Sequence, residues 1–273
     1  MDFVNTVYEK QIFINDLKIN YIIFGEGNIP IILLHGWGID SSKYIETAKQ
    51  LILQAKSYEV QTRIIIPDLP GFGKSDEPPQ AWGIDDYMEL VKKFIELSLQ
   101  GIDNIILIGH SFGGRIAIKF AAKYPDKVKA LILTGAAGIK HPLSIKQKIF
   151  FVAAKLGKIF FSLPIINKLE KTAQKVLYKA AREKDYYQTQ GVMKETFKKV
   201  IAEDLTPYLE KIITPTLLLW GRNDHSTPLK DGEILHFKIQ NSKFKIVAEA
   251  NHSLPYQYPE KFAKIVAEFI KKY

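Results

Sequence analysis

The sequence has no cysteine among its 273 residues, and this absence excludes several kinds of site. A chain without thiols forms no disulfide, holds no metal through thiolates and uses no cysteine nucleophile. If the chain carries a nucleophilic side chain, we therefore expect an oxygen nucleophile. The lack of cysteine also fits a reducing compartment, and we expect a cytoplasmic protein.

Long apolar runs are absent as well. No stretch approaches the roughly 18 to 20 uncharged apolar residues that span a bilayer. Lys155, Lys158 and Pro164 interrupt the most apolar segment, residues 149–166. The first 15 residues lack a basic stretch followed by an apolar run, so we expect no signal peptide. Because 47% of the residues are hydrophobic, the chain can bury a large core, and intrinsic disorder is excluded.

Acidic residues are in deficit, with 29 Asp and Glu against 38 Lys and Arg and a net charge of +9. Such a balance raises nucleic acid, anionic membrane or an acidic substrate as partners. The excess is local, because residues 139–205 hold 14 basic and 6 acidic residues, and the remaining residues hold 24 and 23. No nucleic-acid motif accompanies the charge, so we expect no nucleic-acid partner. A weak contact of residues 139–205 with an anionic membrane stays open, as does the oligomeric state.

Short apolar runs alternate with helical patterns along most of the chain. Two segments around the turn at residues 15–16 predict a hairpin. Six further runs are typical of buried strands: Ile31–Leu34, Arg63–Leu69, Asn104–Gly109, Val128–Thr134, Pro215–Trp220 and Phe244–Ala248. The alternation predicts an α/β fold with a mostly parallel sheet of about eight strands, covered by helices on both faces.

One segment interrupts this alternation. Residues 139–205 show helical patterns and no strand signal, over a length too great for a loop in a compact domain. We therefore expect a helical cap inserted into a discontinuous core of residues 1–138 and 206–273.

The strongest motif is Gly109-His110-Ser111-Phe112-Gly113, which matches G-x-S-x-G. It lies between a predicted strand and a predicted helix, which is the context that the motif requires. There the serine occupies a sharp turn, and the small glycines let neighbouring segments pass close by. We predict that Ser111 is a nucleophile.

A serine hydroxyl needs a base, and the chain has six histidines. His35 and His110 lie inside glycine motifs, where we expect them to shape loops. His252 follows the last predicted strand and is our candidate base. Asp224 follows the strand before it and is our candidate for the carboxylate that orients the base. The order Ser111, Asp224, His252 is the one expected at this kind of strand-to-helix turn.

Acyl transfer also needs donors for a developing oxyanion. The N–H of Phe112, directly after the serine, is one candidate, and the N–H of Trp37 in the His35-Gly36-Trp37-Gly38 loop is the other. The sequence has no HExxH motif and no other convincing cluster of ligands, so we expect no metal and no organic cofactor.

These motifs together resemble the α/β-hydrolase superfamily, in its serine-nucleophile form with a helical cap. The segments that carry the resemblance are HGWG (35–38), PDLPGFGKSD (67–76), GHSFGGR (109–115), LLLWGRND (217–224) and NHSLPYQYPEKF (251–262). The HGWG loop is similar to that of small esterases, and the GHSFGGR segment is similar to that of C–C bond hydrolases and a menaquinone-pathway lyase. Ser111 excludes the dehalogenase and epoxide hydrolase members, which carry aspartate there.

The resemblance implies hydrolysis of a small to medium carboxylic ester through a triad and an acyl-enzyme. One alternative is a C–C bond hydrolase or lyase acting on a small carboxylated diketone-like molecule. Another is a ligand receptor or signalling protein that retains the triad without turnover. In each case the partner is a small molecule.

The resemblance also suggests residues that contact this molecule. Arg115 has a counterpart that binds carboxylate in the lyase, although its place on the helix after the serine favours a structural role. The family places its lid at the insertion, where aromatic residues are candidates for lining an acyl pocket. The candidates are Phe150, Phe151, Tyr186 and Tyr187.

Overall fold

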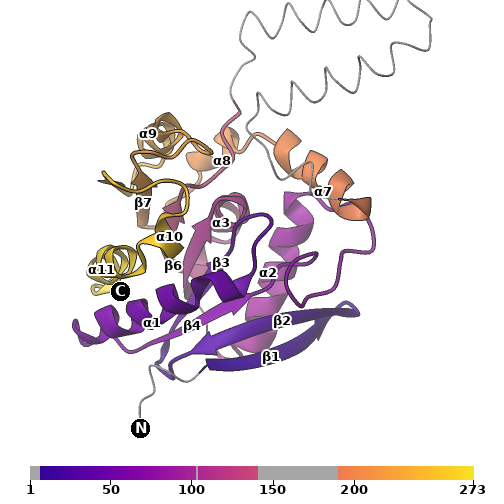
Figure 1. Ribbon diagram of the computed structural model, residues 1–273, viewed down its shortest axis with the longest axis horizontal. Helices are drawn as coiled ribbons and strands as arrows, with labels where there is room; N and C mark the ends of the chain where they lie inside the picture. Colours follow the sequence, from indigo (N-terminus) through magenta and orange to yellow (C-terminus); the bar gives the residue numbers. More distant parts are fainter. Residues whose placement is uncertain (1–6, 103, 141–189) are drawn as a thin grey trace, which may run out of the picture. The chain divides into compact units, whose positions relative to one another are not determined.

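A computed structural model describes residues 7–102, 104–140 and 190–273 of the chain (Figure 1). By its internal contacts the chain divides into two compact units. One unit joins residues 1–139 with residues 190–273, and the other comprises residues 140–189. The features described below belong to the first unit.

The first unit is built on a sheet of eight described strands in the order β1-β2-β4-β3-β5-β6-β7-β8. Strand β2 runs antiparallel to β1 and β4, and the other neighbouring pairs are parallel. The predicted sheet of about eight mostly parallel strands is therefore confirmed. The strands are β1 (Val7–Ile14), β2 (Leu17–Phe24), β3 (Ile29–Leu34), β4 (Thr62–Pro67), β5 (Ile105–His110), β6 (Val128–Thr134), β7 (Thr216–Gly221) and β8 (Ser242–Val247).

Helices cover both faces of this sheet (Figure 1). Helices α2 and α3 pack with α9 on one face, and α1 packs with α11 on the other. In the described ranges, no helix is long and apolar enough to cross a membrane. The helices are α1 (Ile45–Lys56), α2 (Ile84–Ser98), α3 (Phe112–Lys123), α7 (Gly191–Ala202), α8 (Thr206–Leu209), α9 (Leu229–Lys238), α10 (Leu254–Gln257) and α11 (Pro259–Ile270), with short 3₁₀ turns η1 (Ser41–Tyr44) and η2 (Pro125–Lys127).

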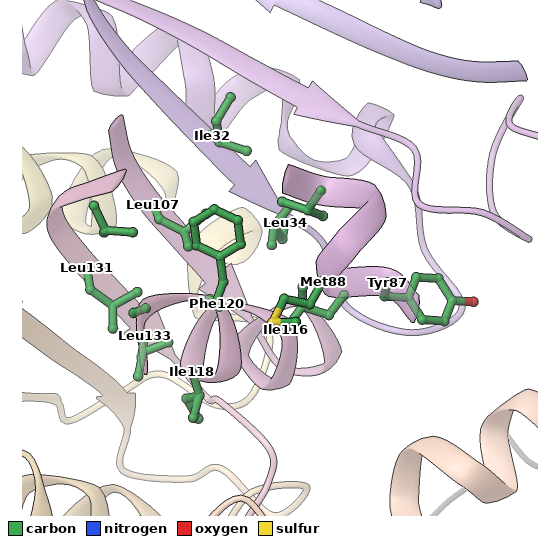
Figure 2. Close-up of a cluster of buried hydrophobic side chains, with 14 of the residues drawn as sticks. Ile32, Leu34, Tyr87, Met88, Leu107, Ile116, Ile118, Phe120, Leu131 and Leu133 are labelled. Carbon is green, nitrogen blue, oxygen red and sulfur yellow. The ribbon is translucent and has the colours of Figure 1, made fainter. Parts of the chain in front are cut away.

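Strand β3 shows how one apolar run fills two cores. Successive side chains of a strand point to opposite faces, so Ile32 and Leu34 join the core with α2 and α3, while Ile31 and Leu33 join the core with α1 and α11. Figure 2 shows the first of these cores, where Leu34 lies near side chains of α2 and α3. Burying one such side chain contributes about 1.5–3 kcal/mol, which is why the apolar strand runs dominate the fold.

Helix α2 begins after a glycine, and a carboxylate inside the helix caps it. The N-cap is Gly83, and its N–H donates to Asp86 Oδ2 at 2.7 Å. A carboxylate three residues into a helix can reach back to this N–H, so Asp86 takes the capping role. Asp85 is thereby free to pair with Lys119 Nζ of α3 at 2.8 Å.

Helix α7 packs with the sheet unit although it falls within the segment expected to be the cap. Trp82 N–H donates to the Thr196 hydroxyl at 3.0 Å, and the buried Phe197 ring meets the Trp37 ring at 4.9 Å between centroids. The apolar side of α7 is therefore covered by the core. Residues 190–205 of the expected cap belong to the sheet unit, and its residues 141–189 lie outside the described residues.

Candidate active site

Ser111 lies between β5 and α3 in a strained backbone conformation, with φ 52° and ψ −110°. Such a conformation costs about 1–3 kcal/mol in a residue with a side chain, so the surroundings must impose it. A Cβ at Gly113 would lie 2.2 Å from the Leu34 carbonyl oxygen, and one at Gly109 would lie 2.7 Å from Ala117 Cβ. Only glycine allows this close packing of α3 on the sheet, which holds the serine at the carboxyl ends of the strands.

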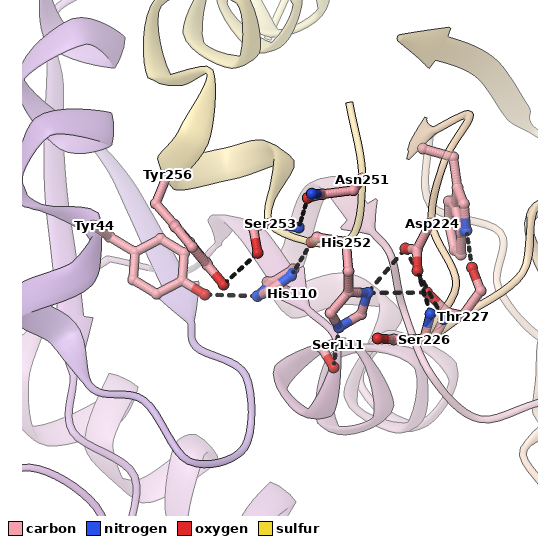
Figure 3. Close-up of polar contacts among 11 residues, drawn as sticks. Tyr44, His110, Ser111, Asp224, Ser226, Thr227, Asn251, His252, Ser253 and Tyr256 are labelled. Carbon is pink, nitrogen blue, oxygen red and sulfur yellow. Dashed lines mark hydrogen bonds and ion pairs between the residues drawn. The ribbon is translucent and has the colours of Figure 1, made fainter. Parts of the chain in front are cut away.

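His252 follows β8, and its ring joins the two other predicted triad side chains (Figure 3). Its Nε2 is 2.9 Å from Ser111 Oγ, and its Nδ1 is 2.9 Å from Asp224 Oδ2. A proton on Nδ1 donates to the carboxylate, which leaves Nε2 as the acceptor for the serine hydroxyl. The three residues follow three different strands, and the fold connects them by hydrogen bonds from Ser111 through His252 to Asp224.

Asp224 is buried, and both of its carboxylate oxygens are hydrogen-bonded. Oδ1 accepts the N–H groups of Ser226 at 2.8 Å and Thr227 at 2.9 Å. Burial acts to raise the pKa of Asp224, but the hydrogen bonds from His252 and Thr227 and the His252 charge outweigh burial and hold this pKa below its ordinary value. Asp224 is therefore ionised at neutral pH, as a group that stabilises a charged His252 must be.

Two further positions shape the His252–Asp224 pair. The Thr227 hydroxyl donates to Asp224 Oδ2 at 2.8 Å and lies 3.3 Å from His252 Nδ1. A Cβ at Gly135 would lie 3.0 Å from His252 Nδ1 and 3.1 Å from Asp224 Oδ2, so a side chain there would crowd the pair. The sequence motifs predict a role for neither residue. The spacing Asp-x-x-Thr, typical of an aspartate that accepts hydrogen bonds from the following turn, is the signal that points to Thr227.

The two predicted oxyanion donors belong to segments that lie next to the serine. Phe112 begins α3, and the first N–H groups of a helix have no intrahelical acceptor. A Cβ at Gly36 would lie 3.4 Å from Ser111 Cβ, so the loop that carries Trp37 passes beside the serine. Within the described ranges, neither the Phe112 N–H nor the Trp37 N–H donates to another protein group. The oxyanion hole remains a prediction that this arrangement permits.

An aromatic cluster fixes the loop that carries Trp37. The Trp37 ring meets Phe72, Phe112 and Phe197 edge-to-face, with centroid distances of 4.9, 5.1 and 4.9 Å. Tyr87 of α2 meets Phe112 in the same manner at 5.0 Å. Such pairs contribute about 0.5–1.5 kcal/mol each beyond the area that they bury. The Trp37 side chain therefore anchors the loop, while its backbone N–H donates to no group in the part of the chain that the structure describes.

His35 is buried and ties the same loop to the turn after β4. Its Nε2 accepts the Leu69 N–H at 2.9 Å, so its Nδ1 carries the proton and donates to the Gly36 carbonyl at 2.7 Å. Burial lowers the pKa of His35, which keeps the ring neutral. The predicted loop-shaping role of His35 is confirmed.

His110 is buried directly beside the triad. Its Nε2 is 2.9 Å from the His252 carbonyl oxygen, and its Nδ1 is 2.7 Å from the Tyr44 hydroxyl (Figure 3). Burial, followed by the proximity of His252, lowers the pKa of His110 to about 3. His110 is thus a neutral ring whose two hydrogen bonds reach residues far away in the sequence, whereas the sequence predicts that it shapes its own loop.

The residues predicted to contact substrate fall into two groups. Nη1 of Arg115 donates to the carbonyls of Val200 and Glu203, each at 3.1 Å, and these bonds hold the end of α7 and the following residues against α3. They give Arg115 the structural role favoured by its position, and a contact with substrate remains a prediction. Four predicted aromatic contacts lie outside the described residues: Phe150, Phe151, Tyr186 and Tyr187.

The described side chains are arranged for nucleophilic chemistry. Ser111 can transfer its proton to His252 Nε2 as its oxygen attacks a carbonyl, while Asp224 stabilises the resulting imidazolium. Among the residues that the structure describes, no three His, Asp or Glu side chains are grouped to hold a metal ion.

Comparison with known proteins agrees with the fold. A family model described as the alpha/beta hydrolase fold matches residues 29–160. The chain has the α/β-hydrolase fold. The match begins with β3 and includes the recognised segments 35–38, 67–76 and 109–115, whereas segments 217–224 and 251–262 lie beyond it.

Relatives of this α/β-hydrolase extend the match to nearly the whole chain. A 2-hydroxy-6-oxononadienedioate/2-hydroxy-6-oxononatrienedioate hydrolase of Paraburkholderia phymatum is 26% identical, over 93% of this chain and 91% of the relative. Among solved structures, a serine hydrolase involved in carbazole degradation aligns with a TM-score of 0.72 at 20% identity, over 98% of this chain and 100% of its own. A membrane phospholipase A aligns with a TM-score of 0.71 at 22% identity, over 98% and 87%. The solved structures support the fold.

Proposed function

We propose that this α/β-hydrolase is a serine hydrolase that cleaves a carbon–carbon bond next to a ketone in a small carboxylated substrate. The observation that carries the hydrolase part is the connected path from Ser111 Oγ through His252 to Asp224, with both hydrogen bonds at 2.9 Å. A hydroxyl bonded to a neutral imidazole, itself bonded to an ionised carboxylate, is the arrangement of an activated nucleophile.

The choice of bond rests on the curated relatives. The protein from Paraburkholderia phymatum covers this chain almost end to end, and its name describes a hydrolase of a 2-hydroxy-6-oxo dienedioate. A protein of the same name from Escherichia coli K12 is 25% identical over 94% of this chain. These relationships favour C–C cleavage over ester cleavage as the reaction of this chain.

The triad suits such a reaction because only the leaving group differs from that of an ester. An oxygen nucleophile adds to the ketone carbon, and the developing oxyanion is held by the N–H groups of Trp37 and Phe112. When the tetrahedral adduct collapses, the adjacent C–C bond breaks, and its electron pair is stabilised by conjugation with the second carbonyl of the substrate. His252 delivers the proton to that carbon, and water completes the formation of the acid product.

Ester hydrolysis is the second candidate, and the preformed triad favours it. An alkoxide leaving group needs no conjugated second carbonyl, so Ser111, His252 and the two N–H groups are sufficient for this reaction. The intermediate would be an acyl-enzyme on Ser111. The two candidates therefore share their machinery and differ in substrate.

A direct comparison of substrates separates these candidates. The purified protein is given a 2-hydroxy-6-oxo dienedioate and, separately, a chain-length series of p-nitrophenyl esters, with Ser111→Ala as the control. We expect kcat/KM for the dienedioate to exceed that for any of the esters by about 100-fold or more, equivalent to about 2.7 kcal/mol of transition-state stabilisation. Mass spectrometry of the two acid products identifies the broken bond.

Each outcome has a defined meaning. Turnover of esters without turnover of the dienedioate would replace the proposal with ester hydrolysis. If Ser111→Ala retains the wild-type rate, the nucleophile assignment is wrong. If neither substrate class reacts while a fluorophosphonate still labels Ser111, a ligand-binding protein that retains its triad becomes the better description.

A further inference from the structure

A buried series of hydrogen bonds links the loop that carries Trp37, the serine turn and His252. It starts at the Gly36 N–H in the loop that carries Trp37, which donates to the Tyr44 hydroxyl at 3.4 Å. That hydroxyl lies 2.7 Å from His110 Nδ1, and His110 Nε2 lies 2.9 Å from the His252 carbonyl oxygen. Figure 3 shows Tyr44, His110 and His252 in sequence, on the side of His252 away from Asp224.

The direction of each hydrogen bond in this chain follows from chemistry. A carbonyl oxygen only accepts, so His110 Nε2 carries the ring proton and donates it to the His252 carbonyl. His110 Nδ1 is then an acceptor, and the Tyr44 hydroxyl must donate to it. That leaves the Tyr44 oxygen to accept from Gly36. One arrangement of protons satisfies every member, so the network is fully connected in a single orientation.

The surroundings hold this network rigidly. Tyr44 is fully buried, and its ring meets Tyr256 edge-to-face at 5.8 Å. His110 is 2% exposed and also meets the Tyr256 ring, at 6.0 Å. A Cβ at Gly36 would lie 3.2 Å from His110 Nδ1, so the backbone of the loop packs directly against the imidazole. Each group therefore has little freedom to move without its neighbours.

We infer that His110 and Tyr44 are positioning residues that fix the backbone of His252 relative to Ser111 and to the loop that carries Trp37. Asp224 orients the His252 ring from one side, and His110 fixes the His252 main chain from the other. Because His110 immediately precedes Ser111, the same residue sets the place of both the base and the nucleophile. This inference rests on the proposed serine hydrolase function.

Two substitutions of His110 separate positioning from general stability. The amide nitrogen of glutamine reaches about as far as histidine Nε2, so His110→Gln keeps a donor for the His252 carbonyl. The shorter asparagine reaches only the place of Nδ1, so His110→Asn keeps a partner for Tyr44 and loses His252. Each variant gives up one buried hydrogen bond, and we expect the two to have similar melting temperatures.

The readout is the second-order rate at which a fluorophosphonate labels Ser111, which is independent of the natural substrate. In this reaction the Oγ–P bond forms, fluoride leaves and the serine proton passes to His252. We expect the labelling rate of His110→Gln to stay within about threefold of wild type. We expect His110→Asn to label more slowly by about tenfold or more, because small displacements of a catalytic group lower the rate strongly. With substrate, the loss should fall on kcat and leave KM nearly unchanged.

A second variant and a control complete the test. Tyr44→Phe keeps the buried ring but removes the hydroxyl that contacts both His110 Nδ1 and the Gly36 N–H. His110→Gln keeps the second of these contacts, so we expect labelling of Tyr44→Phe to be the slower of the two, by about threefold or more relative to wild type. His236→Asn alters an exposed histidine away from the site and should label at the wild-type rate. Equal labelling of His110→Gln and His110→Asn, together with an unchanged rate in Tyr44→Phe, would overturn the inference. Failure of the wild type to label would instead contradict the proposed function.

Discussion

Single residues at the site are held by partners that lie far away in the sequence. Ser111, Asp224 and His252 could be predicted because each follows a strand within a recognisable local motif. Tyr44 could not, because its contact with His110 joins residues 66 positions apart and exists only once the sheet is folded. Local pattern therefore identifies the reacting groups, whereas the groups that orient them depend on tertiary packing.

The neutral state of His110 makes stability depend on pH. Its pKa falls from an ordinary value of 6.5 to about 3 on folding, so between these values the unfolded chain binds a proton that the folded chain does not. The free energy of unfolding therefore decreases on acidification through this window, by up to about 1.4 kcal/mol per pH unit from this group. Urea titrations between about pH 7 and about pH 4.5 measure the slope.

The matched variant for this prediction is His110→Gln, which has no titrating group at this position. The slope gives the number of protons that the chain takes up on unfolding, and this number should be smaller than in wild type by up to one. The buried His35 remains in both proteins, so its contribution cancels in the comparison. The lowered pKa of Asp224 affects stability only at more acidic pH, where that carboxylate becomes protonated. Identical slopes in the two proteins would contradict the neutral, buried state of His110.

Among the structural elements, the strands are predicted best because their apolar runs have no competing interpretation. The predicted run Val128–Thr134 coincides with β6, and the others differ from the observed strands by a few residues. Helix starts are less predictable, since Asp85 and Asp86 both suit the start of α2 and only the pairing of Asp85 with Lys119 decides between them. The sequence predicts that α7 is helical, but it does not show that this helix packs on the sheet unit.

The contact between α3 and β3 depends on Gly113. A Cβ there would lie 2.2 Å from the Leu34 carbonyl oxygen, so Gly113→Ala must push the helix away from the strand. We expect a loss of about 1–3 kcal/mol in the free energy of unfolding, measured by urea titration, because overpacking strains the backbone. Activity of the folded protein should also fall, since α3 carries the serine turn.

Gly83→Ala is the matched control for Gly113→Ala. The nearest contact of a new Cβ at Gly83 is Asp86 Oδ2 at 3.9 Å, which is an ordinary separation. We expect a loss below about 1 kcal/mol, the range of helix N-cap substitutions. If both variants lose equal stability, close packing at Gly113 is not what the fold requires.

At the scale of the whole molecule, the net charge of +9 is unevenly distributed along the sequence. Residues 139–205 carry +8 of it and the remaining residues carry +1. A protein of strong positive charge attracts anions over distances that salt shortens, with a screening length of about 10 Å at 0.1 M ionic strength. We therefore expect the net charge of the whole chain to speed the association of anionic substrates.

Salt should affect charged and neutral substrates differently. Raising sodium chloride from about 0.02 M to about 0.5 M should lower kcat/KM for a dianionic 2-hydroxy-6-oxo dienedioate by about threefold or more. Turnover of neutral p-nitrophenyl acetate should change little, which controls for effects of salt on the fold. An equal response of both substrates would show that the positive charge does not favour anionic substrates.

We assign Ser111 as a nucleophile activated by His252, and covalent labelling is the sharpest test of this assignment. The protein is treated with a fluorophosphonate, digested and mapped by mass spectrometry, in parallel with Ser111→Ala and His252→Gln. We predict one adduct in wild type, on Ser111, no adduct in Ser111→Ala, and labelling about 10³-fold slower or more in His252→Gln, as expected when the base of a triad is removed. Labelling of His252→Gln at the wild-type rate, or an adduct on a residue other than Ser111, would contradict the account.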